Sequence, residues 1–298
     1  MIVNNKSLGL LFLLIGFIVS AQQSSLEKAN SFIKSNKIAQ AKEVLLLASQ
    51  KNPDPKIIER LGDVYGIEKD WDAAAKYYKI LVDKDPKNAN YHFKYGGVLG
   101  MISLESKIRA LTLLDDVKEH FKIACALDEE HLDVRWASID LYLKLPGILG
   151  GSNNKAYQYS EELSAIAPIE GYLSKGFIEA ERNNEKLATT YYQRALDVVA
   201  KNSFPDKNYR RKDIHYQIGD IAYQYKYQIK TGIDHMLVYK NLHTPESIIP
   251  LEDVYYRLAV LYRYQKNKDK ANYYIEEAIV RNPNSKDFIS ENKKIKAL

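Results

Sequence analysis

The chain has 298 residues and a formal charge of +5, from 43 Lys and Arg against 38 Asp and Glu. Hydrophobic residues make up 46% of it, which excludes a wholly disordered chain. A charge balance this small does not single out a nucleic-acid partner, and a single Cys excludes an internal disulfide framework.

The first residues have the composition of an export signal. Lys6 precedes an apolar run at 8–19 in which only glycines intervene, and small residues then fit a cleavage site after Ala21. The run is shorter than the about 20 residues that a bilayer span needs. We therefore expect residues 1–21 to be a signal peptide. The mature protein would work in the periplasm or cell envelope of a bacterium, without stable insertion in the membrane. An uncleaved anchor is the alternative.

A residue pattern recurs along the remaining chain, residues 22–298, which we expect to form one helical repeat domain. Leu61, Gly62, Tyr65, Ala74, Tyr78 and Pro86 are matched 197 positions later, at the same spacing, by Leu258, Ala259, Tyr262, Ala271, Ile275 and Pro283. Looser copies fill the space between. Recurrence at a fixed offset with a helix–turn–helix rhythm is the signature of a solenoid of helix pairs.

The reason for the pattern is steric. A small residue in the first helix of a pair lets the second helix approach closely, as expected for Gly62, Gly96, Gly176, Gly219 and Ala259. Alanine does the same from the second helix, and tyrosines fill the gap. Proline has no N–H to continue a helix, so we expect the second helices to stop at Pro53, Pro86, Pro168 and Pro283.

In chain order the pattern predicts about seven helix pairs and no strands. The pairs fall at about 26–53, 56–86, from 91, 133–168, 171–200, 213–244 and 252–283, and residues 285–298 form a capping helix. The third pair carries about nine extra residues around 101–111, and the fourth a long loop at 145–152.

These residues resemble the tetratricopeptide repeat family over nearly all of 22–283. The resemblance implies an all-α, right-handed superhelical solenoid that binds proteins without catalysis. The Pro-Gly-Ile-Leu-Gly-Gly loop at 146–151 is also similar to that of an exported bacterial subset, for which no activity is implied. Members that clamp a C-terminal carboxylate use Lys and Asn. Asp63 stands at the Asn position, so that role is not implied here.

No catalytic, cofactor or metal set is predicted, and the chain is expected not to be an enzyme. Its six histidines contain no His-Glu-x-x-His and no i, i+4 pair, although His215 and His235 could face one another within one repeat. Cys125 lies in an apolar helical stretch and is expected in the core. The glycine loop at 147–152 lacks a Gly-Lys-Ser/Thr ending, which leaves anion binding a minor alternative.

The predicted function is a protein-binding scaffold whose concave groove, lined by first helices, holds a partner peptide or helix. Repeat offsets give the groove candidates Asp63, Phe93, Arg135, Tyr142, Phe177, Tyr216, Asp220, Tyr223, Tyr256 and Arg263. Packing between repeats is the competing interpretation for each of these tyrosines.

Three other interpretations involve the surface charge or the assembly. Residues 171–298 carry 22 basic and 16 acidic side chains, so a membrane surface or envelope polymer is an alternative ligand. A basic, Tyr-rich cluster at 209–212 could bind single-stranded nucleic acid, but an exported protein would not meet it. A subunit of an export or assembly complex is the remaining alternative.

Overall fold

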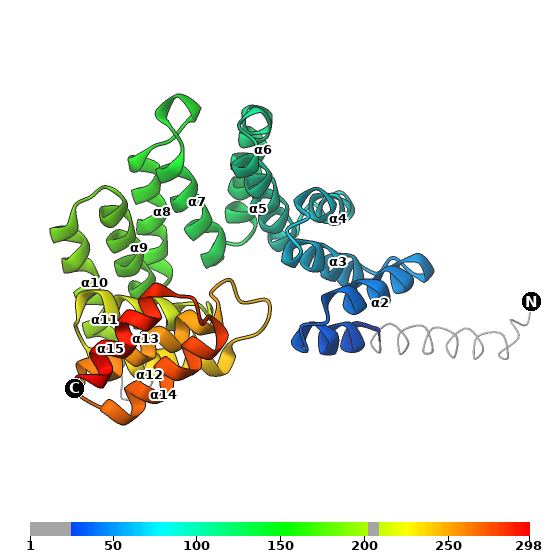
Figure 1. Ribbon diagram of the computed structural model, residues 1–298. Helices are drawn as coiled ribbons and strands as arrows, with labels where there is room; N and C mark the ends of the chain where they lie inside the picture. Colours follow the sequence, from blue (N-terminus) through cyan, green and yellow to red (C-terminus); the bar gives the residue numbers. More distant parts are fainter. Residues whose placement is uncertain (1–24, 202–208) are drawn as a thin grey trace, which may run out of the picture. The chain divides into compact units, whose positions relative to one another are not determined.

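The computed structural model describes residues 25–201 and 209–298 (Figure 1). The predicted signal peptide lies outside them. Every regular element in these ranges is a helix, which confirms the all-α fold class. The chain divides between Glu129 and Glu130 into two compact units, which are described in turn. Among the helices described, none is long and apolar enough to cross a membrane.

The N-terminal unit is a row of helices joined by short turns. Residues 25–34 are helical and are followed by α2 (Ile38–Lys51), α3 (Pro55–Ile67), α4 (Trp71–Lys84), α5 (Ala89–Glu105) and α6 (Lys107–Leu127). Each helix packs on the next one in the chain. Only Ser106 separates α5 from α6, and its hydroxyl accepts a hydrogen bond from Arg109 N–H at 3.4 Å. The nine extra residues therefore lengthen two helices, and they leave Leu104, Ile108 and Leu111 exposed.

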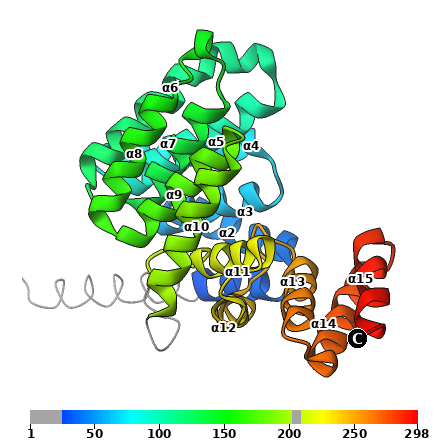
Figure 2. The same cartoon turned by 90° about the vertical axis from the view of Figure 1, so that its left-hand side faces the viewer.

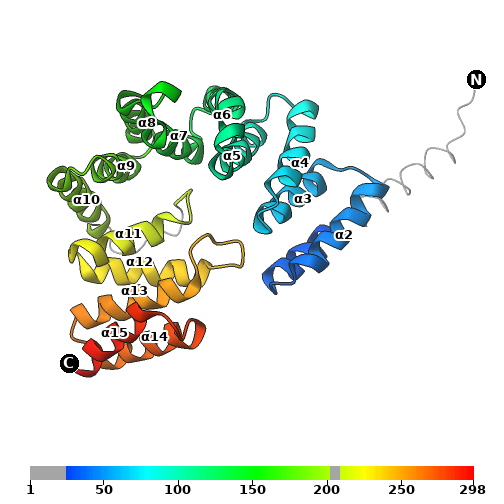
Figure 3. The ribbon, with the colours of Figure 1, turned by 45° about the horizontal axis from the view of Figure 1, so that its top comes forward.

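The C-terminal unit continues the same arrangement. It contains α7 (Leu132–Lys144), the 3₁₀ turn η1 (Gly147–Leu149), α8 (Asn153–Ile166), α9 (Pro168–Glu181), α10 (Glu185–Ala200), α11 (Ile214–Tyr225), α12 (Ile229–Leu242), α13 (Leu251–Tyr264), α14 (Lys268–Arg281) and α15 (Lys286–Lys296). Figure 2 shows α13, α14 and α15 beside one another, and Figure 3 shows α11 and α12 as the preceding layer. As predicted, α15 follows the last helix pair, and it packs on both α13 and α14.

Close approach at the small residues is confirmed in the second repeat. A Cβ placed on Gly62 would lie 2.6 Å from Cε1 of Tyr78, closer than real side chains come. Tyr78 itself is buried, and its hydroxyl donates a hydrogen bond to Asp63 at 2.7 Å. The tyrosine ring therefore occupies the space that the glycine leaves open.

As predicted, α8 stops just before Pro168, at Ile166, with the same spacing as the helices that stop before Pro53, Pro86 and Pro283. Only Ala167 separates α8 from α9, and Pro168 is the first residue of α9. Proline fits there because the first helical N–H has no partner within the helix. Pro168 therefore follows the end of the fourth pair and also begins the fifth, which starts three residues earlier than the expected 171.

The glycine loop is a compact turn that reverses the chain direction between α7 and α8. Gly150 has a left-handed backbone with φ of 91°, and Ser152 N–H donates to Tyr142 O at 2.9 Å. The Ser152 hydroxyl then caps α8. Ile148 is 94% exposed at the tip of the loop. The loop's own geometry explains Gly150 and also Gly151, where a Cβ would clash with the carbonyl oxygen of Leu145.

Candidate partner-binding cavity

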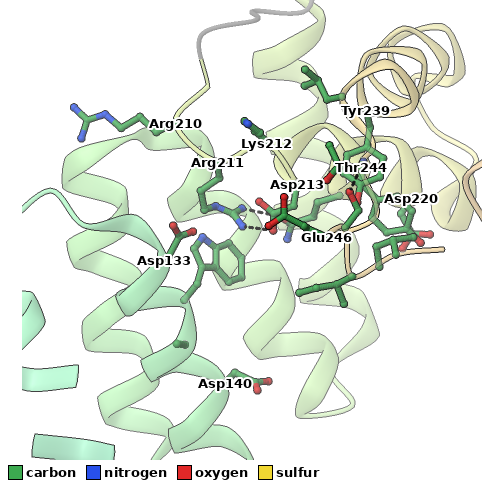
Figure 4. A pocket seen from close by; sticks show the side chains of 18 of the residues that line it. Asp133, Asp140, Arg210, Arg211, Lys212, Asp213, Asp220, Tyr239, Thr244 and Glu246 are labelled. Carbon is green, nitrogen blue, oxygen red and sulfur yellow. Dashed lines mark hydrogen bonds and ion pairs between the residues drawn. The ribbon is translucent and has the colours of Figure 1, made fainter. Parts of the chain in front are cut away.

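A cavity of about 930 Å³ opens on the first helices of the C-terminal unit. Its wall comes from α7, α9, α11 and α12, together with the segments before α11 and after α12 (Figure 4). The lining residues are Asp133, Trp136, Ala137, Asp140, Phe177, Arg210, Arg211, Lys212, Asp213, Tyr216, Gln217, Asp220, Tyr239, Leu242, Thr244, Glu246, Ser247, Ile248 and Ile249. A hollow of this size suits a few side chains of a peptide.

Aromatic rings form two pairs along the wall. The ring centroids of Trp136 and Phe177 lie 6.1 Å apart, and those of Tyr216 and Tyr239 lie 5.3 Å apart. Desolvation raises the pKa of Tyr216, so this hydroxyl stays protonated at physiological pH. The wall therefore offers rigid apolar surface with neutral hydrogen-bonding tips.

A buried ion pair holds the wall together. Arg211 and Glu170 are only 7% and 2% exposed, and the guanidinium donates to both carboxylate oxygens at 2.9–3.1 Å. The indole N–H of Trp136 donates to the same carboxylate at 2.7 Å, and the guanidinium lies 4.7 Å from the indole ring centroid. This cluster fixes the segment before α11 against α7 and α9. It also removes Arg211 from the solvent-exposed basic surface expected at 209–212.

Three of the ten predicted groove residues line the cavity: Phe177, Tyr216 and Asp220. Asp220 forms an ion pair with Arg257 of α13, whose guanidinium also lies over the Tyr216 ring. These three residues come from α9 and α11, so two first helices converge on one hollow as the groove prediction requires.

Three more of the ten pack between alternate helices, from α11 to α13 or from α13 to α15. Tyr223 and Tyr256 meet edge to face at 6.1 Å, and Tyr256 stacks on Phe288 of α15 at 5.1 Å. Arg263 forms an ion pair with Glu291 of α15. All three remain partly accessible and do not line the cavity.

Arg135 and Tyr142 were expected as exposed groove positions, and that expectation was wrong because both are buried. Arg135 donates to Glu162 at 2.9 Å and to the carbonyl of His131 at 3.0 Å. Tyr142 stacks on Tyr159 at 5.9 Å. Tyr142 therefore joins α7 to α8. Arg135 joins α7 to α8 and also binds His131, the residue that caps the start of α7.

The last two candidates lie in the N-terminal unit. Asp63 accepts hydrogen bonds from Tyr78 at 2.7 Å and Lys94 at 2.8 Å. The ring of Phe93 lies 6.2 Å from that of Phe121. Asp63 and Phe93 are partly buried, each in contact with a neighbouring helix.

The expected meeting of His215 and His235 is confirmed, with Nδ1 atoms 3.0 Å apart. His92 and His120 make the same contact in the N-terminal unit, at 2.8 Å. Burial and the neighbouring ring lower the pKa of His235 to about 3, so this ring stays uncharged at physiological pH. Within the described ranges no three His, Cys, Asp or Glu side chains gather in a way that would hold a metal ion. Cys125, expected in the core, is only partly buried.

Several cavity residues escaped the sequence prediction, among them Asp133, Trp136, Glu246 and Ile248. The loop after α12 carries a visible signal, since Ile248 and Ile249 form an apolar pair in a turn segment. Ile248 is 95% exposed at the cavity. No local periodicity pairs Trp136 with the basic segment more than seventy residues later, so that contact could not be read from the sequence.

Residues 252–285, which hold α13 and α14, match the family model described as tetratricopeptide repeat. This stretch of the chain is a tetratricopeptide repeat. Repeats of this family are typically non-catalytic scaffolds for protein–protein interaction. No curated protein matches the chain.

Similar solved structures include a tetratricopeptide repeat protein, MamA and pilF. A tetratricopeptide repeat protein from Parabacteroides merdae is 14% identical, with 93% of this chain and 99% of that chain covered and a TM-score of 0.48. MamA from Desulfovibrio magneticus is 11% identical, with 61% and 97% covered and a TM-score of 0.48. The pilF protein of Pseudomonas aeruginosa is 13% identical, with 94% and 98% covered and a TM-score of 0.41. At sequence identities this low, the structural likeness assigns no partner and no site residue to this chain.

Proposed function

We propose that this tetratricopeptide repeat protein is an exported scaffold that holds a segment of a partner protein in the cavity of its C-terminal unit. The observation that carries the proposal is the cavity itself. First helices α7 and α11 both line it, and two aromatic pairs furnish its wall. Binding hot spots are enriched in aromatic residues that lie in well-packed pockets.

The position of the cavity fits a peptide ligand better than a flat protein surface. It is concave, and the segment after α12 overhangs it with the exposed Ile248. A short chain segment entering the hollow would bury this isoleucine and the rings of Phe177 and Tyr216 without moving the helices. Preorganisation of this kind reduces the entropy cost of binding.

Site-specific photocrosslinking tests the proposal. A benzophenone amino acid replaces Phe177 in the cavity, and a matched control replaces Tyr273, which is exposed on α14. Envelope extracts are irradiated with each protein and the adducts are identified. We expect adducts from position 177 that are missing from position 273. Equal or absent crosslinking at 177 would contradict the proposed site.

Export is supported by the apolar run at 8–19 and the small residues before Gln22. Mass spectrometry of the protein purified from its native host gives the mature N-terminus. We expect a start at Gln22, whereas a chain that begins at Met1 would contradict cleavage of the signal.

A further inference from the structure

The charges around the cavity indicate what kind of segment it accepts. Among the residues that the structure describes, five carboxylates line it, from Asp133, Asp140, Asp213, Asp220 and Glu246, against the three cations of Arg210, Arg211 and Lys212. The local balance is thus −2, although residues 171–298 as a whole are positive. The cavity is an acidic hollow in a basic half of the chain.

Two of the three cations are already neutralised by the protein. Arg211 is buried against Glu170 and also pairs with Asp213 at 2.9 Å. Arg210 pairs with Glu130 at 2.8 Å, and its guanidinium points away from the labelled carboxylates in Figure 4. Three of the five carboxylates are paired as well: Asp140 with Lys144, Asp213 with Arg211 and Asp220 with Arg257.

The carboxylate of Asp133 differs from these paired side chains. Among the described residues it makes no hydrogen bond and no ion pair, although it stands beside the Arg211 cluster on the first turn of α7. Its side chain is open to solvent, yet the protein atoms around it desolvate the carboxylate enough to raise its pKa despite nearby Arg211. A cation from outside would stabilise the ionised form of this group.

We propose that the cavity accepts a Lys or Arg side chain of the partner segment, held by Asp133 and Glu246, with an adjacent apolar residue packed on the aromatic wall. This inference rests on the proposed function and adds the chemistry of the ligand. The methylenes of a Lys or Arg would lie along Phe177 and Ile248 while the charged end reaches the carboxylates. The result is a preference for basic, apolar segments over acidic ones.

Fluorescence anisotropy with three labelled, end-blocked peptides of equal length tests the preference. The peptides share one Trp and one Leu and differ only in carrying Lys and Arg, Gln, or Glu at the remaining positions. We expect the cationic peptide to bind at least about tenfold more tightly than the Gln peptide, and the difference to shrink as salt is added. Equal or tighter binding of the Gln or Glu peptide would overturn the inference.

A pair of double variants locates the effect. Asp133→Asn with Glu246→Gln removes two cavity carboxylates, while Asp234→Asn with Glu276→Gln removes the same charge from α12 and α14 outside the cavity. The first variant should weaken the cationic peptide by about tenfold and the second by less than about twofold. Circular dichroism confirms that each variant is folded. Equal effects of the two variants would also overturn the inference.

Failure of the inference can be told from failure of the proposed function. Crosslinking from position 177 does not depend on the charge of the ligand. If a partner crosslinks at position 177 but the cationic peptide binds no more tightly than the others, only the inference is overturned. The same holds if a partner crosslinks and none of the three peptides binds. Loss of the crosslink as well removes the cavity as a binding site.

Discussion

Asp63 of α3 accepts a hydrogen bond from Lys94 of α5 at 2.8 Å, and Asp220 of α11 pairs in the same way with Arg257 of α13. Each aspartate directly follows the small residue of its first helix, and each cation precedes the next small residue by two positions. Arg60 also donates to Asn30 at 2.8 Å from the equivalent positions. First helices of successive repeats are thus linked by polar pairs at a fixed repeat register.

Replacing Asp63 tests how much this polar link contributes to the stability of the protein. Asp63→Ala leaves the Tyr78 hydroxyl and Lys94 without one acceptor, and we expect the free energy of unfolding to fall by about 1–3 kcal/mol. Asp83→Ala is the control, because its ion pair with Lys79 lies in solvent and should matter by less than about 1 kcal/mol. Urea unfolding measures both variants, and equal losses would contradict a special role for Asp63.

The close approach at Gly62 predicts opposite effects for two glycine substitutions. Gly62→Ala forces the new Cβ into the Tyr78 ring, and overpacking should cost about 1–3 kcal/mol, more than the about 1 kcal/mol that helix propensity returns. A Cβ on Gly97 of α5 meets nothing within 4 Å, so Gly97→Ala should stabilise the protein by up to about 1 kcal/mol. Thermal unfolding of the two variants should shift in opposite directions. A stabilised Gly62→Ala protein would contradict the steric account.

The buried ion pair predicts a non-additive double variant. Arg211→Met alone leaves Glu170 charged and buried, and we expect a loss of about 3–5 kcal/mol in the free energy of unfolding. Adding Glu170→Met removes the uncompensated charge, so the double variant should be more stable than the single one. Lys230→Met, at an exposed pair, is the control. An additive double variant would show that the two side chains are not coupled.

The histidine pair predicts a loss of stability in mild acid. The folded pKa of His235, about 3, lies below the about 6.5 of an unfolded His, so the unfolded chain binds the proton first. The stability is fully present above about pH 6.5 and is lost as the pH falls towards the folded value. Between about pH 6.5 and 5 this one group should cost about 1.5 kcal/mol.

The matching experiment compares the wild type with a His215→Tyr/His235→Tyr variant, since tyrosines Tyr255 and Tyr274 occupy the equivalent positions of the last repeat. Urea unfolding is measured across this pH range. We expect the variant to lose less stability than the wild type. Identical pH profiles would show that the pair does not resist protonation.

The repeats could be predicted from sequence because each follows from local chemistry. Small residues at a fixed offset from large ones indicate where two helices touch, and Gly62 with Tyr78 is the example. His215 and His235 were placed together by the same register. Pro168 marks the end of α8 as predicted, but the start of α9 at the same residue was not predicted, because sequence spacing does not show that a single residue separates the two helices.

The cavity could be predicted only in part. Repeat offsets name residues of the first helices, so Phe177, Tyr216 and Asp220 were found. They do not say which polar side chain turns inward, and Arg135 was missed as a buried residue for this reason. The cluster of Trp136 and Arg211 joins segments without a common periodicity, and only the folded chain brings them together.

Within each unit, the substantial helix contacts of the described residues join elements no more than two places apart in the chain. Such a molecule can open from one end while the rest stays folded. The cavity is different, because its wall runs from Asp133 to Ile249. The cluster of Trp136, Arg211 and Glu170 already links α7 to the segment before α11. A segment seated in the cavity would add a second link, from α7 to α12, and would act as a non-covalent strut. Amide hydrogen exchange in α7 and α12 should then slow together when the cavity is filled, which makes the ligand part of the cooperativity of the fold.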